Sequence, residues 1–156
     1  MAYYLTKERS IEDVCKSWRR YQEYLRQHQQ QFPPGAFAIA TSDWWYDFND
    51  HRSPHDAWLE SVTFSEPSRG ERSEIRYTQL KVRLLAAYHD GFNELLYPRV
   101  FSYSLQSADC AHGLGDWRYD EFTLSPAGHV IHEIEWARGQ RWIIEASDIE
   151  YLWIPK

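Results

Sequence analysis

Residues 128–155, GHVIHEIEWARGQRWIIEASDIEYLWIP, carry the sequence pattern that decides the fold. Two alternating apolar and polar runs, 129–136 and 141–147, flank the turn-like segment Ala137–Gln140. A period of two is typical of β-strands, whose successive side chains point to opposite faces. The stretch therefore predicts an antiparallel hairpin, and the first run predicts one face with Val130, His132, Ile134 and Trp136 and an opposite face with His129, Ile131, Glu133 and Glu135.

Similar patterns occur upstream and predict four more strands, over 57–65, 75–89, 92–106 and 116–124. Asp90-Gly91 is a common two-residue hairpin turn, and Pro98 indicates a bulge or an edge position within the strand that contains it. Together with the C-terminal hairpin, these segments predict an antiparallel β-meander of about six strands over 56–154.

The first 50 residues predict one or two helices. Ser10, with Asp13 three residues later, is typical of a helix N-cap, and apolar residues then recur at three- and four-residue steps as far as His28. This pattern predicts an amphipathic helix over 10–31, and a second helix is predicted over 36–50. We therefore expect an α+β fold, with a mainly helical part (1–50) packed on the sheet of a single domain spanning residues 1–156.

Composition restricts the function. The chain of 156 residues has a net charge of −6 and no long basic run, which argues against general nucleic-acid binding. It has two cysteines, no apolar stretch of membrane-spanning length and no apolar signal core at its N-terminus. We expect a cytoplasmic protein, a monomer or homodimer, with no membrane association and no cofactor.

The HEIE motif in the first run raises the question of a chemical site. Tight four-residue turns on either side of that strand would place His132 between Glu121 and Glu145, whereas a one-residue slip would reverse the faces. Imidazole with carboxylates can bind metal ions or exchange protons, so these three residues are the candidate catalytic groups. The alternative, which we favour because one histidine is a poor ligand set, is a cross-strand ion network.

The same registers would place Arg118, Asp120, Glu133 and Glu135 together on the other face. Charged side chains with nearby aromatic rings, here Trp117 and Trp142, are typical of binding surfaces. These six residues are therefore candidates for partner binding. A solvated face of compensating charges is the alternative for the charged members, and sheet packing is the alternative for the tryptophans.

Two His-Asp pairs, His55-Asp56 and His89-Asp90, are further candidates for metal ligation. The second pair resembles the metal-binding signature of the His-Asp phosphohydrolases, and that resemblance implies metal-dependent hydrolysis. Proteins of that family are almost entirely helical, however, and Asp90-Gly91 is also explained as a hairpin turn.

The run His55-Asp56-Ala57-Trp58-Leu59, followed by Leu80–Ala86, Glu94–Tyr97 and Val100, resembles small uncharacterised bacterial proteins in which such a strand opens an antiparallel sheet. Some of these proteins act as immunity proteins, and no catalytic residues carry over from them. The resemblance implies a non-enzymatic protein-binding module, for which a basic toxin is the most concrete partner, since the chain is acidic.

Two alternatives remain open. One is a metal-dependent hydrolase centred on His132, and the other is a small-ligand-binding protein. A protein binder should expose its acidic and aromatic residues. A hydrolase should hold His132 at the floor of a cleft, beside an ion or a second histidine. A ligand binder should have an apolar cavity lined by tryptophan.

Overall fold

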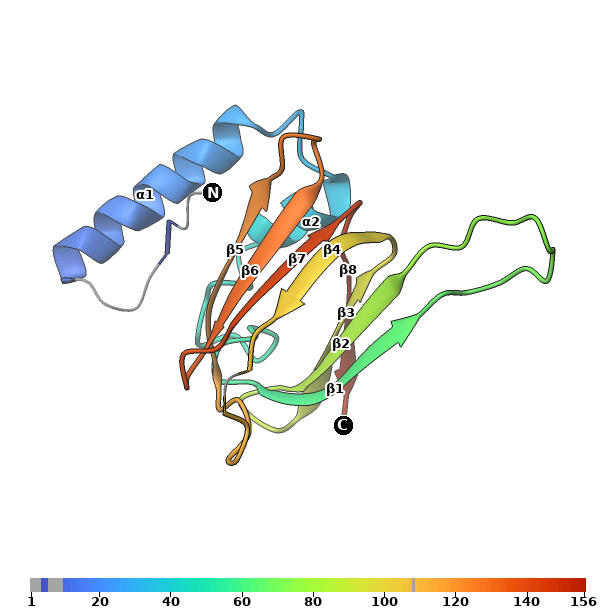
Figure 1. Cartoon of the computed structure of the whole chain (residues 1–156). Coiled ribbons are helices and arrows are strands. Elements are labelled where there is room, and N and C mark those ends of the chain that lie inside the picture. The colour runs from blue at the N-terminus through green and yellow to red at the C-terminus, as the bar shows by residue number, and fades with distance from the viewer. Residues whose placement is uncertain (1–3, 6–9, 108) are drawn as a thin grey trace.

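The computed structural model describes residues 4–5, 10–107 and 109–156. In this part of the chain, two helices precede eight strands that form two four-stranded antiparallel sheets, so the fold is α+β (Figure 1). The elements are α1 (Ile11–Gln27), α2 (Pro34–Ala40), β1 (Trp58–Ser65), β2 (Gln79–Leu85), β3 (Gly91–Tyr97), β4 (Val100–Leu105), β5 (Trp117–Leu124), β6 (Val130–Trp136), β7 (Arg141–Ala146) and β8 (Glu150–Pro155).

The two sheets share one hydrophobic core. The first sheet has the strand order β1-β2-β3-β8 and the second has the order β4-β7-β6-β5. The sheets meet where Trp58 forms a bridge with Asp116, just before β5. Buried apolar side chains come from both sheets and both helices, among them Tyr21, Leu25, Ile39, Leu80, Val82, Leu95, Phe122, Ile134 and Ile144.

The expected α+β class is confirmed, but the simple meander of about six strands is not. The segment 92–106, predicted as one strand, divides around Pro98 into β3 and β4, which belong to different sheets. Proline has no amide hydrogen to donate to a ladder, and the chain changes sheets at this point. Strand β8 was not predicted, because its pairing with β3 is a long-range contact that local alternation does not reveal.

The observed starts of the two helices lie closer to the predicted starts than the observed ends lie to the predicted ends. Ser10 caps α1 by accepting the amide hydrogen of Asp13, as expected, and α1 ends at Gln27 rather than near residue 31. The helix predicted over 36–50 is shorter, since α2 stops at Ala40. Beyond it, the side chains of Asp47 and Asp50 accept amide hydrogens two residues ahead, and such local bonds compete with helix formation.

Strand β5 is an edge strand whose free edge is covered by side chains. The hydroxyl of Tyr21 in α1 accepts from the Phe122 amide at 2.7 Å and donates to the Phe122 carbonyl at 2.9 Å. Three further bonds continue along the strand: Tyr24 Oη accepts from the Leu124 amide, Tyr46 Oη donates to the Asp120 carbonyl, and His55 Nδ1 donates to the Arg118 carbonyl. An exposed edge invites pairing with another chain, and this row of bonds prevents it.

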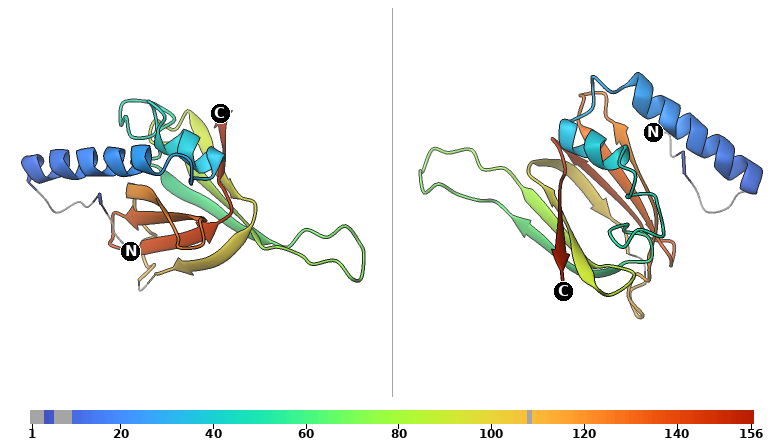
Figure 2. Two further views of the ribbon diagram at one scale, coloured as in Figure 1. Left: turned by 90° about the horizontal axis from the view of Figure 1, so that it is seen from above. Right: turned by 180° about the vertical axis from the view of Figure 1, so that it is seen from behind.

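Helix α1 projects beyond the sheets at its N-terminal end, as the views from above and from behind also show (Figure 2). Tyr21 and Leu25 are buried, whereas Ile11 is 85% exposed and Val14 46% exposed. The apolar stripe of α1 is therefore only partly covered. Within the described residues, no helix combines the length and the apolar character that a membrane span needs. Cys15 and Cys110 are exposed free thiols.

The edge cover by Tyr21 can be tested by removing its hydroxyl. Tyr21→Phe should destabilise the fold by about 1–3 kcal/mol, because it leaves a buried amide and a buried carbonyl of Phe122 without partners. Tyr24→Phe is the matched comparison; it removes one bond to Leu124 at a less buried position and should cost less. Urea unfolding of both variants gives the two values. Equal losses, or no loss for Tyr21→Phe, would contradict this role.

Candidate functional site

The two hairpins that flank β6 have three-residue loops rather than the four-residue turns expected. The Ser125 amide donates to the His129 carbonyl at 2.8 Å, and the Trp136 amide donates to the Gln140 carbonyl at 3.0 Å. The third loop residue is glycine in both cases, in the left-handed region with φ of 82° and 89°, namely Gly128 and Gly139. This arrangement is a common hairpin type that depends on such a glycine. Each shorter loop shifts the pairing by one residue.

The shift makes the expected Glu121–His132–Glu145 cluster wrong. His132 pairs with Phe122 on one side and with Ile144 on the other. Glu121 and Glu145 consequently point to the opposite face of the sheet from His132. The predicted division of β6 itself into two faces agrees with the observed pairing, so the error arose in the turns and not in the strand.

His132 instead belongs to a polar network inside the core. Its Nδ1 lies 2.7 Å from the Tyr97 hydroxyl, and its Nε2 lies 2.8 Å from Oδ2 of Asp120; both His132 and Tyr97 have no exposed surface. Because a carboxylate only accepts, Nε2 of His132 carries the hydrogen in the bond to Asp120, and the Tyr97 hydroxyl pairs with Nδ1. Burial, with a smaller contribution from the charge of Asp120, raises the pKa of Tyr97 well above its usual value.

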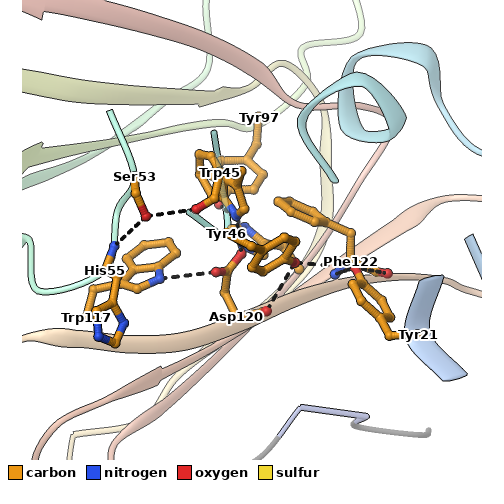
Figure 3. A network of polar contacts seen from close by, with 10 residues as sticks. Tyr21, Trp45, Tyr46, Ser53, His55, Tyr97, Trp117, Asp120 and Phe122 are labelled. Atoms are coloured by element: carbon orange, nitrogen blue, oxygen red, sulfur yellow. Dashed lines mark hydrogen bonds and ion pairs between the residues drawn. The ribbon is translucent and has the colours of Figure 1, made fainter. Parts of the chain in front are cut away.

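Asp120 receives two further hydrogen bonds from indole N–H groups (Figure 3). Trp45 Nε1 donates to Oδ2 at 2.9 Å, and Trp117 Nε1 donates to Oδ1 at 3.3 Å. Three donors thus converge on a carboxylate that is almost fully buried. Such donors offset the cost of removing the charge from water. The network fixes the position of the Asp120 carboxylate. His132 is bonded to this carboxylate and has no contact with solvent.

The outer face of the second sheet carries a second buried carboxylate. Oε2 of Glu121 accepts the amide hydrogens of Tyr4 at 2.6 Å and Leu5 at 3.0 Å. Its Oε1 is also buried, and none of the described residues donates a hydrogen bond to it. Burial is the main reason that the pKa of Glu121 rises to about 8, and the two amide bonds oppose the rise. Glu121 therefore links β5 to the N-terminal segment.

The other acidic residues on this face differ in their surroundings. Glu133 lies opposite Glu121, and burial raises its pKa, whereas Arg141 opposes that rise. Glu135 lies 3.5 Å from Arg141. Glu145 is near the surface, and its bond with His129 lowers its pKa.

The six residues predicted to bind a partner do not share an exposed surface. Asp120 points into the core, and Glu133 and Glu135 lie on the opposite face. Arg118 is partly exposed and its guanidinium lies 2.8 Å from Asp56. The other five are buried: Trp117, Asp120, Glu133, Glu135 and Trp142.

The two His-Asp pairs differ in their contacts. Nε2 of His55 lies 3.6 Å from Asp56, while Nδ1 of His55 donates to a backbone carbonyl of β5 and Asp56 also binds Arg118. Asp90 lies 2.5 Å from Nδ1 of His51, while His89 packs edge-on against Trp58. His89 has a φ of 58° in a four-residue loop, so the two-residue Asp90-Gly91 turn was wrong. The described part of the chain contains no group of three or more His, Cys, Asp and Glu residues able to hold a metal ion.

A cavity of about 310 Å³ lies beside the Asp120 network, between α1, the segment before β1, and β5. We call it the α1–β5 cavity. Most of its wall is aromatic or aliphatic, and Asp120 provides a carboxylate next to the indoles that bind it. The residues lining it are Leu5, Val14, Ser17, Trp18, Trp45, Tyr46, Phe48, Pro54, His55, Trp117, Arg118, Tyr119 and Asp120.

Several of these lining residues were not singled out from the sequence. Trp18 was recognised only as part of the apolar stripe of α1. Tyr46 and Phe48 fell in a segment predicted as helix, so their place in the cavity wall could not be inferred. The available signal was the aromatic run Trp44–Phe48 itself, which is unusually rich in rings for a connecting segment.

Comparisons of the chain with protein-family models, with curated proteins and with solved structures found no match. The resemblance to small bacterial proteins therefore remains a prediction.

The buried Glu121 gives a test based on pH. A carboxyl whose pKa is raised by folding binds more protons in the folded state, so its contribution to stability falls as pH rises from about 4.5 to about 8. Glu121→Gln keeps the shape and removes the charge. At pH 9 this variant should be more stable than the parent by at least ~1.4 kcal/mol, the equivalent of one pKa unit. At pH 5 the difference should be small.

Glu145→Gln is the matched control for this test. The pKa of Glu145 is lowered by its bond with His129, so this substitution should reduce stability at neutral pH rather than increase it. Thermal unfolding of both variants at pH 5, 7 and 9 measures the two trends. A Glu121→Gln variant no more stable than the parent at pH 9 would rule out the raised pKa.

Proposed function

We propose that the protein is a non-enzymatic binding protein that takes a small, largely apolar molecule into the α1–β5 cavity. The observation that carries the proposal is the cavity itself, whose wall contains Trp18, Trp45 and Trp117. Ligand sites in proteins are typically concave and mostly apolar, with a few fixed polar groups that orient the ligand. Asp120 supplies such a group, because three donors hold its carboxylate in place.

The surroundings of His132 favour binding over catalysis. His132 has no exposed surface and is not among the residues that line the cavity; it is hydrogen-bonded to Asp120, which does line it. Its second nitrogen is occupied by Tyr97, which is also fully buried. A general acid or base must come within hydrogen-bond reach of its substrate, so this geometry gives the hydrolase alternative little support.

The mouth of the cavity offers a test that leaves the core intact. Val14 lines the cavity and is partly exposed, whereas Ile11, one turn earlier on α1, is exposed and is not part of the lining. Val14→Trp should obstruct the cavity and weaken binding of the neutral fluorophore N-phenyl-1-naphthylamine at least ~10-fold, or about 1.4 kcal/mol. Ile11→Trp should leave the affinity unchanged.

The fluorescence titration decides between two outcomes. Binding by the parent that is weakened by Val14→Trp alone supports the cavity as the ligand site. Equal affinity of both variants would place the fluorophore elsewhere, and absence of binding to the parent at concentrations near the solubility limit of the fluorophore would count against the proposal.

Binding of another protein is a second candidate, favoured by a different surface. Phe64, Phe101 and Tyr103 on β1 and β4 are exposed, and the rings of Phe64 and Tyr103 lie 4.8 Å apart. Exposed aromatic side chains are common in protein interfaces. We call Phe64, Phe101 and Tyr103 the aromatic group. An immunity-type protein would bind its partner through this group rather than through the residues that the sequence predicted for partner binding, which are mostly buried.

This second candidate can be examined with arrays of lysine- and arginine-rich peptides, which represent a basic partner. The parent protein should bind a subset of them, and the double variant Phe101→Ser/Tyr103→Ser should lose that binding. Binding that survives the double substitution would show that the aromatic group is not the contact surface.

A further inference from the structure

The aromatic residues around the α1–β5 cavity meet at steep angles. The rings of Trp18 and Tyr46 lie 5.0 Å apart at 73°, and those of Trp45 and Trp117 lie 6.3 Å apart at 83°. Rings arranged in this way form adjoining walls rather than one flat stack. Figure 3 shows Trp45, Tyr46 and Trp117 around the Asp120 carboxylate. Phe48 and Tyr119 extend the aromatic lining beyond these four rings.

The charges at the cavity favour a cation. Among the described residues that line it, Asp120 is the only acidic one and Arg118 is the only permanently cationic one. The Arg118 guanidinium is paired with Asp56 at 2.8 Å and lies 3.4 Å from Asp116. Asp120 receives its hydrogen bonds from two indoles and from His132. The cavity therefore combines a carboxylate with several aromatic rings, and the faces of such rings carry negative potential.

We propose that the α1–β5 cavity binds an organic ammonium cation, quaternary or N-methylated; this inference rests on the proposed ligand-binding function and names its ligand class. Several ring faces together with one carboxylate attract a weakly hydrated cation whose positive charge is spread over methyl groups. The cavity volume of about 310 Å³ accommodates a group of this size. A metal cation would need additional ligands, and among the described residues the cavity has one carboxylate and one imidazole.

Choline and 3,3-dimethyl-1-butanol provide the test, because the two molecules have the same shape and differ in the positive charge. Titration of the 156-residue chain by tryptophan fluorescence and calorimetry should show choline binding at least ~10-fold more tightly than the neutral alcohol, as expected for a desolvated cation on aromatic rings. High salt should weaken choline binding and leave the alcohol unaffected.

Two variants test whether the preference for choline over the neutral alcohol arises in the α1–β5 cavity. Asp120→Asn should reduce the affinity for choline at least ~10-fold and the affinity for the alcohol by much less. Because this change also disturbs the buried network, Phe48→Leu is the second variant; Phe48 is half exposed, and leucine keeps an apolar wall without a ring. It should weaken choline several-fold and the alcohol little.

The outcomes separate the two proposals. Equal affinities for choline and the alcohol, or no choline binding by a protein that still binds N-phenyl-1-naphthylamine, would overturn the cationic ligand class and leave the ligand-binding function standing. Failure of all three molecules to bind would overturn both.

Discussion

A carboxylate held away from water must be surrounded by hydrogen-bond donors, and the core of this protein is organised by that requirement at Asp120. The donors come from three separate parts of the chain: Trp45 from the segment after α2, Trp117 from the start of β5, and His132 from β6. His132 extends the network to Tyr97 in the other sheet. Loss of the carboxylate would leave several buried groups without partners, so the network specifies how these parts pack together.

The same arrangement positions the cavity. Trp45 and Trp117 are fixed by their bonds to Asp120, and both also line the space under α1. Helix α1 is held against β5 by Tyr21, whose hydroxyl satisfies both backbone groups of Phe122. The cavity is therefore bounded by elements that independent polar contacts keep in place, which is the preorganisation that a ligand site requires.

The sequence predicted those features that depend on local patterns. The start of α1 at Ser10, most of the strands and the two faces of β6 follow from capping and alternation, which short segments determine by themselves. The neighbours of His132 did not follow, because a single residue in the length of each loop, at Gly128 and at Gly139, decides which side chains meet across the sheet. The cavity depends on contacts between residues far apart in sequence, such as Trp45 with Asp120, and no local pattern encodes these.

The position of the hydrogen on the His132 imidazole most directly tests the claim that Asp120 organises the core by binding three buried donors. Long-range ¹H–¹⁵N correlation spectra of the imidazole distinguish a nitrogen that carries hydrogen from one that accepts it. The network predicts a hydrogen on Nε2 of His132 and slowly exchanging indole N–H groups for Trp45 and Trp117, since Asp120 binds all three. A hydrogen on Nδ1 alone, or rapid exchange of both indole groups, would contradict the role assigned to Asp120.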